Sequence, residues 1–259
     1  MSPAPIPLQS ALVYGPVDSR RLGRSLGVNP LGAGRKLCNM SCIYCQYPEE
    51  EGEAGSFPDL AAVLDAVERA LPGSGAEAVT VAGNGEPTLH PAFLDLARGL
   101  ARLRDRYAPG APLCLLTNGS RLDQAEVRAA LDGFDRPIVK LDAGDPRTLH
   151  AINRPRGIDL ERLLAGLVAL PRLELQSMFV GGAVSNATPD RVARWIEAVR
   201  LVRPRFVQVT TVDRGTCVAG VRPVPAEYLE TLAGLLRAEG IEAEAYPCRD
   251  EGAFGVTEV

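Results

Sequence analysis

Short apolar segments alternate with amphipathic segments along most of this chain, and this alternation is the feature that most constrains its fold. Strands are expected at residues 26–28, 78–82, 112–116, 137–141, 173–180, 206–212 and 241–246. Helices are expected between them, from the helical spacing of apolar residues, at about 58–71, 93–107, 124–131, 147–152, 160–169, 189–199 and 225–240. Parallel strands need a long crossover, which is usually a helix. The pattern therefore predicts an α/β fold in which parallel strands and helices form repeated βα units.

The second constraint is the segment KLCNMSCIYCQ, in which Cys38, Cys42 and Cys45 form a CxxxCxxC run. Disulfides pair cysteines two at a time, so an odd thiol would be left over. Structural zinc is normally closed by four ligands, and no fourth cysteine or histidine lies nearby in sequence. A 4Fe-4S cluster held by three cysteines instead keeps one iron open for a non-protein ligand. The run therefore favours an iron–sulfur centre, with a structural zinc site as the rival interpretation.

Composition limits the setting in which this centre would work. The chain has 259 residues and is 46% hydrophobic, and no apolar run is long enough to span a membrane. Its start lacks the basic segment and apolar core of a signal peptide. Six cysteines, three of them in one loop, suit a reducing compartment. We expect a cytoplasmic protein built as one domain over residues 1–259, with a core at about 13–246.

Charge argues against broad nucleic-acid binding. The 28 basic residues are outnumbered by 32 acidic residues, which gives a net charge of −4. Binding along a nucleic-acid backbone depends on neutralising phosphates with Lys and Arg. A local basic patch remains available between Arg20 and Lys36, where no acidic residue occurs. Nucleic acid is therefore a possible partner but not a favoured one.

Polar and glycine-containing motifs follow the expected strands. GNGEP, at residues 83–87, follows the strand that ends at Ala82, and Thr117-Asn118-Gly119-Ser120 follows the next one. Lys140 and Asp142 alternate on one face of a later strand end, where an internal ion pair is the alternative to a role in the site. Active sites of βα barrels gather at the carboxyl ends of the strands. The motifs are therefore expected to share one functional edge.

The cysteine run, with Tyr44 just before its third cysteine, resembles the signature of the radical S-adenosylmethionine (radical SAM) superfamily. GNGEP resembles the GGEP motif of that family, with Asn84 in place of the second glycine. The wider set GPVDSRRLGRSLGVN, GNGEPTLHP, TNGS, VKLDAGD and INRP resembles the wybutosine-biosynthesis branch of the radical SAM oxidoreductases. This resemblance implies a partial (βα)6 barrel of the TIM type, with the cysteine loop after its first strand.

The resemblance also implies the chemistry. Cys38, Cys42 and Cys45 would ligate three irons of one 4Fe-4S cluster, and SAM would chelate the fourth iron. An external electron donor such as flavodoxin or ferredoxin would supply the electron that cleaves SAM to a 5′-deoxyadenosyl radical, which takes hydrogen from a substrate that the sequence does not name. With polar residues at the expected strand ends included, the candidate site residues, in addition to the three cysteines, are Lys140 as a catalytic residue and Tyr44, Gly83, Asn84, Gly85, Glu86, Pro87, Thr117, Asn118, Asp142 and Ser177 for the cofactor.

Within that set, Glu86 is expected to meet the ammonium group of SAM, and Tyr44 to lie against its adenine end. Thr117 and Asn118 are expected at the ribose or the carboxylate, with turn formation as the alternative. Asn153 and Arg154 are expected to close over the site.

Alternative activities stay open at this point. They are a tRNA-base-modifying enzyme, an activase for a glycyl-radical enzyme and a non-enzymatic zinc-binding module. The acidic charge and the lack of any cysteine before Cys38 weigh against the tRNA reaction.

The remaining cysteines and the histidines are given other roles. Cys114 is expected to pack in the core, and Cys217 and Cys248 are interpreted as structural or as one reactive thiol. His90 and His150 are interpreted as surface or capping residues.

Overall fold

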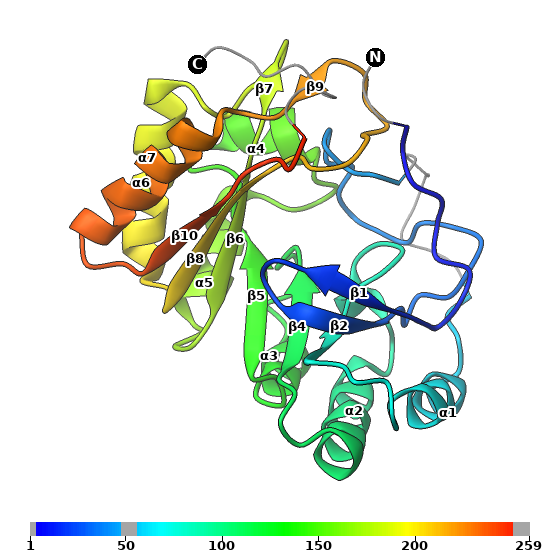
Figure 1. Ribbon diagram of the computed structural model, residues 1–259. Coiled ribbons are helices and arrows are strands. Elements are labelled where there is room, and N and C mark those ends of the chain that lie inside the picture. Colours follow the sequence, from blue (N-terminus) through cyan, green and yellow to red (C-terminus); the bar gives the residue numbers. More distant parts are fainter. Residues whose placement is uncertain (1–3, 48–55, 251–259) are drawn as a thin grey trace. The chain divides into compact units, whose positions relative to one another are not determined.

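The computed structural model describes residues 4–47 and 56–250, and the chain forms two compact units (Figure 1). The N-terminal unit comprises Leu8–Asn39 and Glu50–Ile138, and the C-terminal unit comprises Met1–Pro7, Met40–Glu49 and Val139–Val259. The boundary therefore falls inside the cysteine run. Residues 251–259, beyond the core expected at about 13–246, lie outside the described residues. Among the residues that are described, no helix is long and apolar enough to cross a membrane.

The N-terminal unit is a mostly parallel sheet with helices in the crossovers. Its strands are β1 (Val13–Ser19), β2 (Gly23–Val28), β3 (Ala78–Val81) and β4 (Leu113–Thr117). Strands β2, β3 and β4 are parallel neighbours in that order, whereas β1 pairs with β2 in the antiparallel direction. Its helices are α1 (Leu60–Ala70), the 3-10 turn η1 (Pro87–Leu89), α2 (Phe93–Tyr107) and α3 (Ala125–Leu131). The predicted βα order is confirmed here.

Burial explains why these segments form strands and helices. All four residues of β3 are buried, which is typical of a parallel strand covered on both faces. Val63 and Val67, one turn apart, are the buried face of α1. Cys114, in β4, is fully buried in a cluster with Leu22, Ala78 and Ile138, so its predicted packing role is confirmed.

Two features of this unit differ from the sequence prediction. Strand β1 was not expected, because Gly15, Pro16 and Asp18 are typical of turns. His90 is buried rather than on the surface. It is the C-cap residue of the 3-10 turn η1, which agrees with the predicted alternative of a capping residue. Its Nδ1 accepts a hydrogen bond from Ala92 N at 3.1 Å, just before α2 begins, and its Nε2 lies 3.0 Å from Pro58 O.

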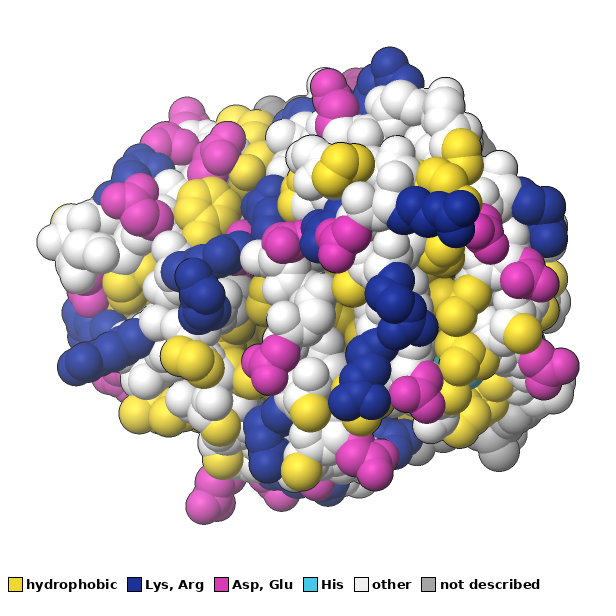
Figure 2. Space-filling view, turned by 90° about the horizontal axis from the view of Figure 1, so that it is seen from below, with side chains coloured by type: hydrophobic (Ala, Val, Ile, Leu, Met, Phe, Trp, Pro, Cys, Tyr) yellow, Lys and Arg dark blue, Asp and Glu magenta, His cyan; other side chains and the backbone are white. Residues whose placement is uncertain are grey.

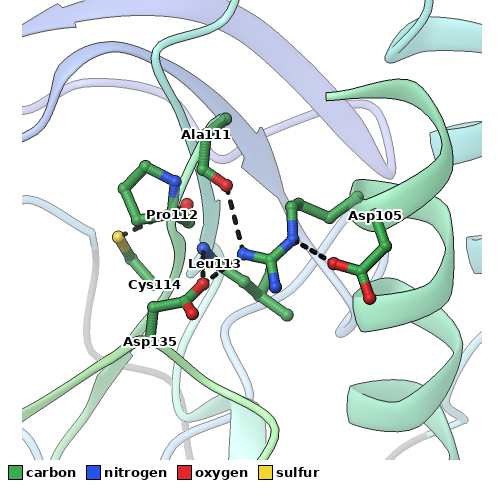
Figure 3. Close-up of polar contacts among 7 residues, drawn as sticks. Asp105, Ala111, Pro112, Leu113, Cys114 and Asp135 are labelled. Carbon is green, nitrogen blue, oxygen red and sulfur yellow. Dashed lines mark hydrogen bonds and ion pairs between the residues drawn. The ribbon is translucent and has the colours of Figure 1, made fainter. Parts of the chain in front are cut away.

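A polar network joins the end of α2 to the start of β4 (Figure 3). Arg104 donates to Ala111 O at 3.1 Å, to Asp105 at 2.7 Å and to Asp135. Asp135 in turn accepts a hydrogen bond from Leu113 N at 2.7 Å, where β4 begins. Burial alone would raise the pKa of Asp135, but the hydrogen bonds from Leu113 and Arg104 outweigh it, and the pKa is lowered.

Strand β5 (Arg136–Lys140) crosses the boundary, since the N-terminal unit ends at Ile138. The elements that follow it belong to the C-terminal unit. They are α4 (Pro146–Asn153), α5 (Leu160–Val168), β6 (Glu174–Phe179), β7 (Gly181–Gly182), α6 (Pro189–Val202), β8 (Phe206–Thr211), β9 (Val221–Arg222), α7 (Ala226–Ala238) and β10 (Ala243–Tyr246).

The C-terminal unit continues the βα pattern. Strands β6, β8 and β10 are parallel neighbours, and α7 packs against β8 and β10 (Figure 1). The two-residue strands β7 and β9 form a separate antiparallel pair that the sequence did not predict. Trp195, in α6, stacks edge-on against Phe179 with ring centroids 4.9 Å apart. Each expected helix and strand is confirmed to within a few residues at its ends, and the strands β1, β7 and β9 are present in addition.

Surface charge is mixed where it can be seen. On the face drawn in Figure 2, Lys and Arg side chains are interspersed with Asp and Glu and with hydrophobic side chains. This agrees with the slightly acidic composition of the chain.

Candidate functional site

In the N-terminal unit, the cysteine run begins with a backbone pairing to the GNGEP loop. Leu37 N donates to Asn84 O at 2.8 Å, and Glu86 N donates to Leu37 O at 2.8 Å. Leu37 and Gly85 thereby form an isolated parallel bridge immediately before Cys38. The GNGEP loop follows β3, so the sheet fixes where the cysteine run starts.

Glycine is needed at Gly85 because of this close approach. Its φ is +136°, and a Cβ built there would lie 1.8 Å from Leu37 O. Gly83, with a φ of +151°, would place a Cβ 2.4 Å from Asn29 Oδ1. The two glycines of the motif thus permit a packing that no other residue would allow.

Asn84, the departure from the family motif, fastens the loop to the N-terminal segment. It is fully buried. Its Nδ2 donates to Gln9 O and Gly32 O, each at 2.8 Å, and its Oδ1 accepts from Gln9 N at 2.8 Å. Asn29 Oδ1 lies 3.2 Å from Asn84 N and accepts its hydrogen bond. An amide here does structural work that a glycine could not do.

Glu86 is buried in a dense set of hydrogen-bond donors. Its Oε1 accepts from Thr88 N at 3.0 Å, Thr88 Oγ1 at 2.7 Å and Thr117 Oγ1 at 2.6 Å. Its Oε2 accepts from Asn118 N at 2.6 Å. Burial raises the pKa of Glu86, and these hydrogen bonds oppose the rise. Because a carboxylate oxygen can accept more than one hydrogen bond, Oε2 keeps capacity for a further donor.

The loop after β4 carries the polar contacts of Cys38. Asn118 Nδ2 lies 3.9 Å from Cys38 Sγ and donates to Asn39 Oδ1 at 2.9 Å. Asn39 Nδ2 donates to Ser120 Oγ at 2.9 Å, and Asn118 Oδ1 accepts from Ser120 N at 2.9 Å. Asn118 therefore directs an N–H group toward the sulfur of the first cysteine.

In the C-terminal unit, the rest of the cysteine run pairs with the end of α4. Ser41 N donates to Asn153 O at 3.0 Å, and Ile43 N donates to Ile152 O at 2.9 Å. These bonds place Cys42 and Tyr44 beside the Asn153 side chain. Asn153 Nδ2 lies 3.3 Å from Cys42 Sγ, 3.2 Å from Tyr44 OH and 2.7 Å from Asp142 Oδ2. The Tyr44 hydroxyl also donates to Asp142 Oδ2.

Asp142 is the centre of this cluster and is held from several elements. Its Oδ1 accepts from Met178 N at 2.7 Å, and Asn186 Nδ2 donates to its carbonyl oxygen at 2.9 Å. Ser177, a predicted cofactor-binding residue, directly precedes Met178 in β6. Its hydroxyl donates to Leu141 O at 2.6 Å and accepts from Trp195 Nε1 at 2.9 Å, so Ser177 fixes the strand end that carries Asp142.

Charges and burial shape the properties of this cluster. Lys140 Nζ lies 4.6 Å from the centroid of the Tyr44 ring, which is within cation–π range. Burial raises the pKa of Tyr44 well above its usual range, and the Asp142 carboxylate adds to this effect. Burial also raises the pKa of the Cys42 thiol, and Asp142 again adds to the rise while Lys140 opposes it.

An apolar cluster lies against the same residues. It consists of Ile43, Ile152, Val180, Val212 and Val221, and Tyr44, Met178 and Val218 pack on it. The loop after β8 reaches the end of the cysteine run, where Cys217 N donates to Cys45 O at 3.0 Å. Arg214 donates to Gln46 Oε1 at 3.2 Å in the same region. Sequence reasoning did not anticipate this contact of Cys217.

The chemistry of these side chains fits an iron–sulfur group. All six cysteines lie among the described residues, and none forms a disulfide. Amide N–H groups of Asn118 and Asn153 point at the sulfurs of Cys38 and Cys42, and such donors stabilise thiolate ligands. Within residues 4–47 and 56–250, no three His, Cys, Asp or Glu side chains already form a metal-binding group. The fit therefore lies in the type of donor: three thiols in one run, two of which have a side-chain amide N–H directed at the sulfur.

The structure brings several of the predicted site residues together in each unit. The structure groups Glu86, Thr117 and Asn118 in the N-terminal unit, and Tyr44 and Asp142 in the C-terminal unit. Asn39 and Asn186 were missed, because a buried asparagine has no spacing signal that separates it from a turn residue.

Comparison with known proteins agrees with this fold and shows the family. Residues 36–221 match the model of the Radical SAM superfamily, and this chain belongs to that superfamily. A UPF0026 protein of Synechocystis is 35% identical over 211 residues, which cover 78% of this chain and 76% of the relative. Members of this superfamily use an iron–sulfur cluster and SAM.

Solved structures support the fold. A structure of TYW1 with a lysine–pyruvate adduct bound has a TM-score of 0.59 and 16% identity, over 83% of this chain and 73% of that one. SuiB of Streptococcus suis, bound to S-adenosylmethionine, has a TM-score of 0.64 and 12% identity, over 87% of this chain and 52% of that one. The predicted α/β fold, the partial (βα)6 barrel of radical SAM proteins, is confirmed.

Proposed function

We propose that this protein is a radical SAM enzyme that binds one 4Fe-4S cluster through Cys38, Cys42 and Cys45. The observation that carries the proposal is the pair of buried asparagines, Asn118 and Asn153, that direct amide N–H groups at the sulfurs of Cys38 and Cys42. When bound and reduced, the cluster would supply the electron that cleaves SAM to methionine and a 5′-deoxyadenosyl radical, and the radical would take a hydrogen atom from the substrate to give 5′-deoxyadenosine.

The residues of the N-terminal unit would bind the methionyl end of SAM. Glu86 Oε2 accepts a hydrogen bond from the ammonium group. This oxygen already accepts one hydrogen bond, from Asn118 N, and can accept a second. Asn118 orients the carboxylate from the loop after β4. Thr117, the last residue of β4, acts indirectly, because its hydroxyl donates to Glu86 Oε1. Gly83, Asn84, Gly85 and Pro87 hold the GNGEP loop in the shape that pairs with Leu37.

The residues of the C-terminal unit would bind the nucleoside end. Tyr44 lies against the adenine, and Asp142 holds the Tyr44 hydroxyl in place. Lys140 contributes a positive charge near the ring of Tyr44. Ser177 acts indirectly, through its bond to Leu141 O. An external electron donor such as flavodoxin or ferredoxin would serve a cytoplasmic enzyme of this kind.

The test is anaerobic reconstitution with iron and sulfide, followed by incubation with SAM and a strong reductant. We expect about four irons and four sulfides per chain and formation of 5′-deoxyadenosine. Cys38→Ala, Cys42→Ala and Cys45→Ala should each lose the cluster and the product. Cys248→Ala, a buried cysteine outside the run, is the matched control and should keep both. Bound zinc with intact SAM would overturn the proposal in favour of a structural metal site.

A further inference from the structure

In the Asn153 side chain, the amide nitrogen has several hydrogen-bond partners, whereas the amide oxygen has none. Its Nδ2 faces Cys42 Sγ, Tyr44 OH and Asp142 Oδ2 at 2.7 to 3.3 Å. The residue is only 2% exposed, yet its Oδ1 is buried and has no hydrogen-bond partner. Buried side-chain oxygens nearly always have a hydrogen-bond partner, and Asn153 Oδ1 is an exception. A bound ligand with a hydrogen-bond donor would satisfy it.

The orientation of the amide is fixed by its neighbours. A flipped amide would place Oδ1 against the Asp142 carboxylate, and two acceptors cannot hydrogen-bond to one another. The backbone is fixed as well, because Asn153 O accepts from Ser41 N at 3.0 Å. The unpartnered Oδ1 is therefore a property of the fold and not of a side chain placed the wrong way round.

The surroundings select the kind of donor. A cationic donor is disfavoured, because Lys140 already places an ammonium 4.6 Å from the Tyr44 ring. A sugar is disfavoured, because the apolar cluster of Ile43, Ile152, Val180 and Val212 packs against Tyr44. A flat, largely apolar ring that carries a neutral N–H group suits both conditions.

We propose that Asn153 Oδ1 accepts a hydrogen bond from the exocyclic amine of the adenine of SAM. The inference rests on the proposed function, since it requires SAM to bind here. Asn153 then joins two parts of the site, because one amide supports Cys42 and Asp142 through Nδ2 and recognises the base through Oδ1. Met178 is partly exposed and packs on the same apolar cluster as Tyr44.

The test measures binding rather than turnover. SAM and an analogue that carries hydrogen in place of the 6-amine of the purine are compared by equilibrium dialysis on the reconstituted protein, without reductant. The wild type should bind SAM about 5- to 10-fold more tightly than the analogue, the effect of one hydrogen bond to a buried acceptor. Asn153→Ala should bind SAM more weakly and reduce this ratio to about 1 to 2, since the acceptor is gone.

Two further variants separate recognition from structural damage. Asn153→Asp keeps an acceptor oxygen and should keep a preference for SAM even where its overall affinity falls. His150→Ala, exposed on the same helix α4, should keep the wild-type ratio. The ratio is internal to each protein, so partial unfolding of a variant lowers both affinities and leaves the ratio informative.

The outcomes distinguish this inference from the proposed function. A wild type that binds SAM and the analogue equally, or an Asn153→Ala protein that keeps the full preference, overturns the role of Asn153 alone. A reconstituted wild type that binds neither compound overturns the proposed function as well.

Discussion

Leu37 and Gly85 form a parallel bridge in which both backbone groups of Leu37 are used. Its N–H donates to Asn84 O and its carbonyl accepts from Glu86 N, each at 2.8 Å. The residue that precedes the first cysteine is thus held by the same loop that presents Glu86. The start of the cysteine run and the GNGEP loop therefore depend on one backbone contact within the N-terminal unit.

Gly85→Ala should break this contact. Its φ of +136° is unfavourable for alanine, and the new Cβ would lie 1.8 Å from Leu37 O. We expect the free energy of unfolding to fall by more than about 2 kcal/mol, from strain and overlap together. Iron content after reconstitution should fall with it. The measurements are denaturant unfolding and iron analysis.

Gly110→Ala is the matched control, because a Cβ there has nothing within 4 Å and its φ is not in the left-handed range. It should change stability by less than about 0.5 kcal/mol. Equal stability of the two variants would contradict the importance of the bridge.

His90 should make the fold sensitive to mild acid. Burial lowers its pKa below the usual value. Above a pH of about 6.5 the histidine is neutral in both folded and unfolded states. As the pH falls below that, the unfolded chain takes up the proton first, so the free energy of unfolding decreases until the pH passes the lower pKa of the folded state.

Unfolding measured between about pH 7 and pH 5 checks this expectation. His90→Gln should flatten the decrease with pH. His150→Gln changes the only other histidine, which is exposed, and should keep the wild-type slope. A wild-type slope retained in His90→Gln would refute the assignment.

Asp135 should stabilise the N-terminal unit through the network of Figure 3. Asp135→Ala removes the acceptor of Leu113 N, a residue with no exposed surface, and leaves a buried donor unpaired. The expected loss is about 1–3 kcal/mol. Because the pKa of Asp135 is lowered, its contribution is present above a pH of about 3.9 and is lost as the pH falls through the folded-state pKa.

Asp105→Ala is the comparison for this variant. Asp105 also meets Arg104, but its side chain is 67% exposed, so its loss should cost less than about 0.5 kcal/mol. Denaturant unfolding of both variants at neutral pH decides between a buried hydrogen bond and a general effect of removing an acid near Arg104.

Periodicity predicted most of the elements because each one buries an apolar face of its own. It failed for β1, an antiparallel edge strand that is largely exposed and contains Gly15 and Pro16, so that no apolar pattern marks it. It failed for β7 and β9 because two residues are too few to show a period. These strands depend on backbone pairing, which a side-chain pattern does not record.

In the candidate site too, some features could be predicted from the sequence and others could not. The spacing of the cysteines and the GNGEP motif indicated which segments matter. The sequence could not show that Asn84 binds Gln9 and Gly32, or that Asn153 meets Asp142, because those partners are set by the fold. Buried asparagines acquire their roles from tertiary contacts, and four of the most connected polar residues here, Asn84, Asn118, Asn153 and Asn186, are of this kind.

Glu86→Gln tests the proposed role of the buried carboxylate. An amide nitrogen in place of either oxygen would face a donor, Asn118 N on one side or the Thr88 and Thr117 groups on the other. We expect a loss of about 1–3 kcal/mol in stability. We also expect SAM binding at least about 10-fold weaker, because the charge that would meet the ammonium is gone.

Thr117→Val separates these two effects. It removes one hydrogen bond to Oε1 and keeps the carboxylate charge. Stability should fall by about 1 kcal/mol, while SAM affinity, measured by equilibrium dialysis without reductant, should change by less than about 3-fold. If Glu86→Gln binds SAM as Thr117→Val does, Glu86 has only a structural role, and the ammonium must be bound by another group.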